Sequence, residues 1–311
     1  MWTYVLRRVA SGAIALFGLT LVVFFIVHLV PGDPAVTLLG PRATPEAIAT
    51  LHREWGLNQP IYDQYEKFIS HLIHGDMGAS LFFHAPVTSL IAGRLPATLL
   101  LLVYSTLLAV ILTIPLATIA ALRQGGIVDQ FVRAVSLMGL GAPAVWMGLV
   151  LILFLAVRMG AFPVGGYNDS TGIHLQAMFL PSLTVALGMF PTLTRSLRAS
   201  LIGVLAADYI TNARARGLSG YSVVIRHGVR NAIAPTVTVL GLNVGYLVGS
   251  TVAVEVIFAI PGIGNLMVQA VLSRDFPIVQ GVTIVYGILV LSINLLTDVT
   301  HAALDPRVVL E

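Results

Sequence analysis

Six long apolar stretches limit what this chain can fold into. They cover residues 9–30, 96–122, 131–157, 177–194, 232–257 and 278–301. A helix rises about 1.5 Å per residue, so roughly 20 apolar residues cross the hydrocarbon core of a bilayer. Apolar residues make up 57% of the chain and charged residues 10%, against about a quarter charged in soluble domains. The sequence therefore predicts an all-α, multi-pass transmembrane helical bundle with about six spanning helices.

The first stretch follows Arg7 and Arg8, as the core of a signal peptide follows its basic residues. It is longer than a usual signal core, and Pro31-Gly32-Asp33-Pro34 follows it in place of a small-residue cleavage site. We therefore expect a retained first transmembrane helix.

The net charge of +3 comes from arginines that flank apolar spans, so we expect no nucleic-acid partner. The chain has no cysteine, which excludes disulfides and thiolate metal sites.

The positive residues predict the orientation, because cytoplasmic loops carry an excess of Lys and Arg. With both termini in the cytoplasm, eleven of the seventeen fall inside: Arg7, Arg8, Arg123, Arg133, Arg195, Arg198, Arg214, Arg216, Arg226, Arg230 and Arg307. Six fall outside: Arg42, Arg53, Lys67, Arg94, Arg158 and Arg274. This topology gives a basic cytoplasmic loop at 195–231. It also gives an extracytoplasmic segment at 32–95, where Ile61, Tyr65, Phe68 and Leu72 predict an amphipathic helix.

A short helix is predicted within the cytoplasmic loop. Asp208 suits the first turn, arginines follow toward the far end, and Gly217 can adopt the left-handed conformation that ends a helix. The small residues Ala213 and Ala215 would let another surface approach closely. On this segment alone, a docking helix and a solvated basic loop both remain open.

The loop sequence resembles the EAA loop of binding-protein-dependent ABC importer permeases. Gly217 matches the closing glycine of that loop and Ala213 its final alanine, whereas Thr211 and Asn212 replace the usual Glu-Ala. With these two replacements, and with Asp208-Tyr209 before them, the loop resembles that of the peptide-permease branch of the family. Segments along the whole chain resemble the B-type subunit of that branch: Arg7-Arg8, Pro31-Gly32-Asp33-Pro34, His74-Gly75-Asp76-Met77-Gly78, Arg94-Leu95-Pro96-Ala97-Thr98, Arg230-Asn231-Ala232, Glu255 to Phe258, Pro261-Gly262-Ile263-Gly264, Arg274-Asp275-Phe276-Pro277 and Leu304-Asp305-Pro306-Arg307.

The resemblance implies a type I ABC importer permease in the bacterial plasma membrane that imports di- or oligopeptides. It implies a second homologous permease, two ATP-binding subunits and an extracytoplasmic substrate-binding protein as partners. Residues 1–95 would form the first helix and external segment, and 96–311 the core transmembrane domain. Residues 205–218 would form the helix that couples to the ATPases, with Asp208, Tyr209, Ala213, Ala215 and Gly217 at its contacts. Nickel chelates, glutathione or haem remain alternative substrates.

Catalysis and cofactors are expected on the partners. The chain has no Gly-x4-Gly-Lys-Ser/Thr phosphate loop, so ATP and its Mg²⁺ would bind the ATPase subunits and this chain would be no enzyme.

Two other function classes fit the sequence less well. A motif of rhomboid proteases is imitated by Gly217-Leu218-Ser219-Gly220, with His301 as partner, but Ser219 lies among cytoplasmic arginines. An ion-driven carrier would need paired ionisable residues near the bilayer centre. The candidates are His28, Glu255, Asp298 and His301, and the two acids are expected at opposite ends of their spans.

Two asparagines and a histidine cluster complete the candidate sites. Asn243 and Asn294 lie inside spans at comparable depth and could hydrogen-bond across helices, or contact substrate. In the external segment, His71, His74, Asp76 and His84 have weakly metal-like spacing. We interpret them as exposed polar residues and expect no metal site.

Overall fold

The computed structural model describes residues 2–29, 36, 44–54, 58–80, 82–167 and 175–304. Most of these residues are helical, and no strand forms among them. Pro31-Gly32-Asp33-Pro34 and Asp305-Pro306-Arg307 lie outside the described residues. The prediction of an all-α, multi-pass membrane protein is confirmed.

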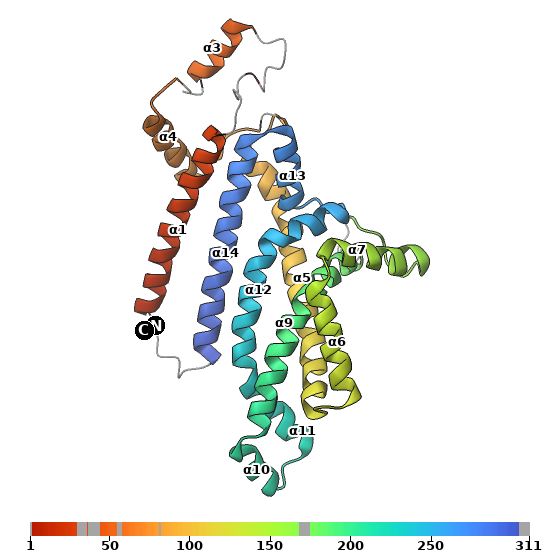
Figure 1. Cartoon of the computed structure of the whole chain (residues 1–311). Coiled ribbons are helices and arrows are strands. Elements are labelled where there is room, and N and C mark those ends of the chain that lie inside the picture. Colours follow the sequence, from red (N-terminus) through yellow and green to blue (C-terminus); the bar gives the residue numbers. More distant parts are fainter. Residues whose placement is uncertain are drawn as a thin grey trace.

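Five long helices form an elongated bundle (Figure 1). They are α1 (Trp2–Leu29), α5 (Val87–Leu122), α9 (Phe179–Leu205), α12 (Arg230–Ile257) and α14 (Phe276–Leu304). Four helical segments within the described residues are long and apolar enough to cross a membrane: Arg7–Ile26, Val87–Leu122, Gly220–Ile257 and Phe276–Thr300. They correspond to the first, second, fifth and sixth stretches of the sequence.

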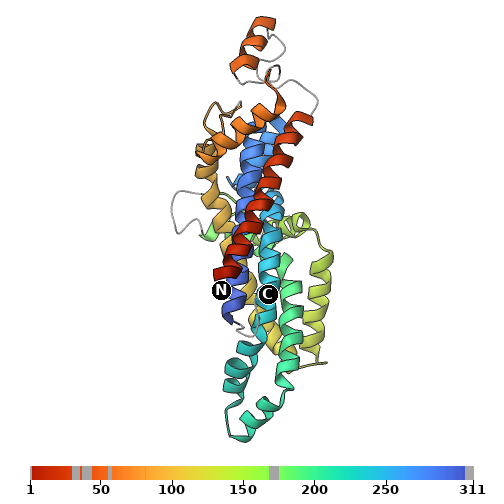
Figure 2. The same ribbon diagram turned by 90° about the vertical axis from the view of Figure 1, so that its left-hand side faces the viewer.

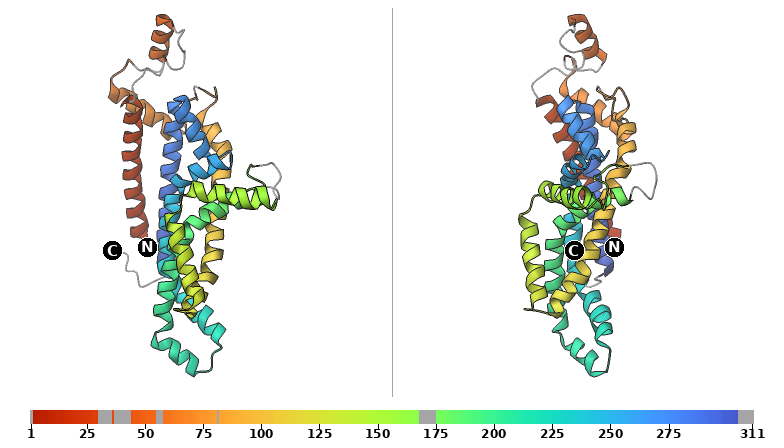
Figure 3. Two further views of the ribbon diagram at one scale, coloured as in Figure 1. Left: turned by 45° about the vertical axis from the view of Figure 1, so that its right-hand side comes forward. Right: turned by 90° about the vertical axis from the view of Figure 1, so that its right-hand side faces the viewer.

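The third stretch is bent, so the expectation of one continuous helix over 131–157 is wrong. Helix α6 (Ile127–Gly141) is followed by α7 (Ala144–Leu151) and the π-helical segment η1 (Ile152–Arg158). The two parts meet at 113°. Ala142 and Pro143 both have extended backbone angles, because a proline keeps the preceding residue out of the helical region and cannot donate to the turn before it. As a result α7 and η1 lie across the bundle (Figures 1 and 3).

The fourth stretch corresponds to α9, which continues past the expected boundary at residue 194 to Leu205. Arg195 and Arg198 end the apolar pattern there but do not end the helix. Leu197, between the two arginines, and Leu201, beyond them, are fully buried against α5 and α12. Because α9 packs on α5, α6 and α12, protein covers much of its surface. It therefore needs fewer apolar residues than a helix that faces lipid.

The segment between α1 and α5, which the sequence predicts to be external, contains α3 (Pro45–Glu54) and α4 (Ile61–Ile73). Figures 1 and 2 place α3 beyond one end of the bundle and α4 beside the same end of α1. The predicted amphipathic helix is confirmed as α4, which packs on α1 through aromatic side chains. Tyr65 and Phe68 contact Phe24 with centroids 5.2 and 5.8 Å apart, and the Tyr65 hydroxyl lies 2.9 Å from Thr20 Oγ1.

Helix α13 (Ile263–Ser273) is held at its start by a buried carboxylate. Glu255 lies near the end of α12, as the sequence predicted, and it is fully buried inside the protein. Its Oε1 accepts from the Thr98 hydroxyl of α5 at 2.7 Å, and its Oε2 accepts from the Asn265 backbone N–H at 2.9 Å. A side chain at Gly262 would collide with this carboxylate. The Pro-Gly-Ile-Gly motif thus gives Glu255 access to the first turn of α13.

A second buried acid joins the external segment to the turn before α14. Asp275 is 1% exposed, and its Oδ2 accepts from the Ser80 hydroxyl at 2.6 Å and the Phe82 backbone N–H at 3.0 Å. The two segments that the sequence analysis noted around residues 74–78 and 274–277 therefore meet in space.

Candidate functional site

The candidate site is the connection between α9 and α12. It contains α10 (Asp208–Ala215), α11 (Gly220–Ser222) and the π-helical segment η2 (Val223–Val229). Figures 1 and 2 show it projecting from the end of the bundle opposite α3 and α4. The long helix α9 leads into it, and η2 continues directly into α12.

Helix α10 has the ends that its sequence predicts. Asp208 lies in the first turn, after an extended Ala207, where a carboxylate faces the positive end of the helix dipole. Gly217 has φ +78°, its N–H donates to Arg214 O at 2.9 Å, and the Leu218 N–H donates to Ala213 O at 3.3 Å. These two bonds form a Schellman ending, which favours glycine at this position. An added Cβ on Gly217 would meet no atom within 4 Å, so the requirement is conformational.

The inner face of α10 packs on η2. Ile210 and Val223 are fully buried and Ala213 is 8% exposed. Ala213 therefore does not offer a close approach to another surface, and that part of the sequence interpretation is wrong. The alanine supports internal packing, because its small side chain lets α10 lie against η2.

Tyr209 connects α10 to the start of α12. Its hydroxyl donates to His227 O at 3.4 Å and accepts from Asn231 Nδ2 at 3.3 Å. Asn231 Nδ2 also donates to His227 O at 2.8 Å. Helix α10 is thus fixed to the membrane helices by an apolar contact and by this polar one.

The outer face of α10 is polar, basic and exposed. Its exposed residues are Asp208, Tyr209, Thr211, Asn212, Arg214 and Ala215, with Arg216 and Gly217 following. The helix has no group arranged for covalent chemistry. Ser219 Oγ accepts from the Ser222 N–H at 3.3 Å and caps α11, which is a structural role. A rigid, exposed and capped helix of this kind is suited to contact with another protein.

Asp129 and Arg198 form an ion pair that the sequence analysis did not identify. Arg198 Nε and Nη2 donate to the two Asp129 oxygens at 2.6 and 2.7 Å. The carboxylate is fully buried and also takes the Gly125 N–H at 2.9 Å and Arg133 at 3.4 Å. The pair joins the first turn of α6 to α9, just before α9 reaches the candidate site. The sequence offered one signal for this pair, namely that Asp129 is an acid within the basic segment that follows α5.

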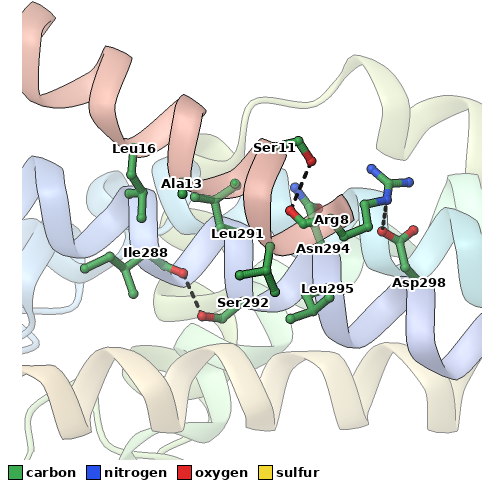
Figure 4. Close-up of a pocket in the computed structure, with 12 residues that line it drawn as sticks. Arg8, Ser11, Ala13, Leu16, Ile288, Leu291, Ser292, Asn294, Leu295 and Asp298 are labelled. Atoms are coloured by element: carbon green, nitrogen blue, oxygen red, sulfur yellow. Dashed lines mark hydrogen bonds and ion pairs between the residues drawn. The ribbon is translucent and has the colours of Figure 1, made fainter. Parts of the chain in front are cut away.

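The asparagines do not bond to one another, so the suggested link between α12 and α14 is wrong. Asn243 of α12 instead accepts from the Thr192 hydroxyl of α9 at 3.2 Å and donates to Val239 O at 2.7 Å. Asn294 lies in a cavity between α1 and α14, close to the Arg8–Asp298 ion pair of 2.9 Å (Figure 4). Asn243 therefore links helices, as one of the two sequence interpretations expected, but through a different partner.

The two acids of the carrier hypothesis have structural partners, whereas the side chains of its two histidines, His28 and His301, lie outside the part of the chain that the structure describes. Glu255 caps α13, and Asp298 pairs with Arg8 near the opposite end of the bundle. In the external segment, His74 Nδ1 lies 2.7 Å from Ser70 O, and Asp76 accepts from the Gly78 N–H at 2.8 Å. Among the described residues, no three His, Asp or Glu side chains are grouped as metal ligands.

Comparison with known families accounts for nearly the whole chain. Residues 113–310 match the model of the binding-protein-dependent transport system inner membrane component. Residues 1–102 match the N-terminal model of the same membrane component. The chain belongs to this family. The resemblance drawn from the loop and the scattered motifs is confirmed.

Curated relatives match this transport-system component over their full length. The oligopeptide transport system permease protein AppB of Bacillus subtilis (strain 168) is 36% identical over 99% of both chains. The probable peptide ABC transporter permease protein y4tP of Sinorhizobium fredii is 35% identical over 99% of both chains. The glutathione transport system permease protein GsiC of Escherichia coli (strain K12) is 36% identical, again over 99% of both chains. As a membrane component of a transport system, the chain is not itself a catalyst.

Proposed function

We propose that this chain is the B-type permease subunit of an ATP-driven importer of di- or oligopeptides. It forms the translocation pathway with a second, homologous permease, and a binding protein delivers the substrate from outside. The names of the relatives in Bacillus subtilis and Sinorhizobium fredii support the substrate class. The observation that carries the proposal is α10, a capped helix with an exposed polar face at one end of the bundle.

Helix α10 couples transport to ATP hydrolysis on partner subunits. Its outer face, with Asp208, Tyr209 and Ala215, contacts a partner ATPase. Ala213 and Gly217 act indirectly: the first seats the helix on η2 and the second ends it. Because α10 is tied to α12 through Tyr209 and continues from α9, movement of the ATPase surface reaches two membrane helices. ATP and Mg²⁺ bind the ATPases, and this chain holds no cofactor.

The proposal fixes the orientation in the plasma membrane. The end that carries α10 faces the cytoplasm, where ATP is available, and α3 and α4 face outward. The termini are then cytoplasmic. Residues 1–95 supply the first helix and the external segment, and residues 96–311 supply the core that carries the loop at 195–231.

Replacing Gly217 tests the coupling role. Gly217→Asp forces a left-handed backbone on a residue that resists it, at a cost of about 1 kcal/mol, and changes the end of α10. We expect correct insertion and complex assembly, continued ATP hydrolysis and loss of peptide uptake. Gly220→Asp is the matched control, since it adds the same charge to an exposed glycine of the same loop without a positive φ. Normal peptide uptake by the assembled Gly217→Asp complex would contradict the proposal.

Glutathione is the second candidate substrate. The glutathione permease of Escherichia coli is as similar to this chain as the oligopeptide permease of Bacillus subtilis. Glutathione is itself a short peptide, so one pathway chemistry could serve both. Identifying the molecule carried by the cognate binding protein separates the two candidates.

A further inference from the structure

A cavity between α6 and α9 has the features of an anion site at the edge of the membrane. It holds about 290 Å³, far more than the roughly 30 Å³ that one water occupies in the liquid. Three of its lining residues are arginines, namely Arg133, Arg195 and Arg198. It lies toward the same end of the bundle as α10, because α9 runs from this cavity into that helix.

The charges around the cavity do not balance. Two of the three arginines share one carboxylate: Asp129 accepts from Arg198 through both oxygens and forms an ion pair with Arg133 at 3.4 Å. Arg195 has no ion-pair partner among the described residues. The surroundings therefore carry an excess of two positive charges, and Arg195 is the arginine available to an incoming anion.

Two hydroxyls at the cavity are unsatisfied. Thr194 is 1% exposed, and neither its Oγ1 nor Ser136 Oγ has a hydrogen-bond partner within the part of the chain that the structure describes. Both residues line the cavity. A buried hydroxyl without a partner costs about 1–3 kcal/mol, so a bound acceptor would remove an existing penalty.

The remaining walls are apolar and continue onto an open helix face. Val132, Leu137, Pro191 and Ala199 line the cavity. On α6, Phe131, Leu137 and Met138 are 66%, 70% and 74% exposed, which in a membrane protein is a surface for acyl chains. Basic pockets between membrane helices on the cytoplasmic side suit acidic lipid headgroups. We propose that this cavity binds the phosphate headgroup of an anionic phospholipid, with Arg195 and Thr194 as its contacts.

Lipid retention by the purified chain tests this site. The full chain is stripped in neutral detergent, mixed with equal amounts of phosphatidylglycerol and phosphatidylcholine, and examined by native mass spectrometry. We expect one phosphatidylglycerol to be retained in preference to phosphatidylcholine. Because one surface arginine changes binding of an acidic lipid by about fivefold, Arg195→Gln should lower the retention by about that factor. Arg230→Gln, an exposed arginine at the same end of the bundle, should leave it unchanged.

Replacing Thr194 with valine, which has nearly the same shape, distinguishes binding at this site from nonspecific attraction of the lipid to surface charge. Thr194→Val removes an unpartnered hydroxyl, so the lipid-free chain should keep or gain thermal stability while phosphatidylglycerol retention falls. Equal retention of the two lipids, or unchanged retention in both Arg195→Gln and Thr194→Val, would overturn the proposal. Full stabilisation by inorganic phosphate alone, with no added effect of phosphatidylglycerol, would also overturn it, since the site would then bind a soluble anion.

Discussion

The Asp129 carboxylate shows how much one residue can contribute to this bundle. It is fully buried, accepts two hydrogen bonds from Arg198 and one from the Gly125 N–H, and forms an ion pair with Arg133. A buried charge is stable only when it is paired and hydrogen-bonded. The pair therefore fixes where the first turn of α6 sits on α9.

Removing one partner of this ion pair should be costly. Arg198→Gln removes the bidentate partner of the Asp129 carboxylate, which keeps Arg133 and the Gly125 N–H, and we expect a loss of about 1–3 kcal/mol in unfolding free energy. Arg198→Lys keeps the charge and should lose less. The change is measured by thermal unfolding of the purified complex.

The exposed pair between α1 and α14 is the control. Arg8 and Asp298 are 51% and 25% exposed at their side chains, so Arg8→Gln should cost no more than about 1 kcal/mol. An equal loss in Arg198→Gln and Arg8→Gln would show that burial of Asp129 does not strengthen its pair.

The sequence predicted the role of a residue where that role depends on its neighbours along the chain, and failed where the role depends on contacts between distant helices. The end of α10 at Gly217 followed from a glycine placed after a basic helical turn. The pairing of Asp129 with Arg198, and of Asn243 with Thr192, depends on which helices become neighbours. A single sequence carries no signal for that choice when the partners lie far apart in the chain.

At the scale of elements, hydropathy located most helices but misjudged two of them. Arg195 and Arg198 closed the fourth apolar stretch, although α9 runs on to Leu205 because protein covers its far end. In the third stretch the apolar pattern continued through Pro143, although the backbone turns there by 113°. Hydropathy reports which residues avoid water and gives no information on where the helix axis bends.

The contact between α6 and α9 gives a test at this scale. A Cβ on Gly139 would lie 2.9 Å from Pro191 Cγ, and the proline ring cannot rotate away. Gly139→Ala should therefore push α6 from α9 and cost about 1–3 kcal/mol. Gly141→Ala, where an added Cβ meets nothing within 4 Å, should be neutral. Thermal unfolding compares the two, and equal stability of both variants would contradict the close packing.

The whole molecule has two specialised ends connected by long helices. Helices α3 and α4 lie at one end and the loop with α10 at the other (Figure 1). Helix α9 enters that loop and α12 leaves it, and both return to the bundle. The sequence predicted this division, because the loop and external segment are its two long polar regions. It did not predict how α10 is seated, since Ala213 turned out to face inward.

Thiol labelling can determine whether α10 meets an ATPase in the cytoplasm. The chain has no cysteine, so Ala215→Cys places a single thiol on the exposed face of α10, and Tyr62→Cys places one on α4, where Tyr62 is 69% exposed. In sealed right-side-out vesicles, a membrane-impermeant maleimide should label position 62 at once and position 215 only after the membrane is opened. Added ATPase subunits should then protect position 215. Labelling of position 215 in sealed vesicles, or no protection by the ATPases, would show that α10 is not the cytoplasmic contact for an ATPase.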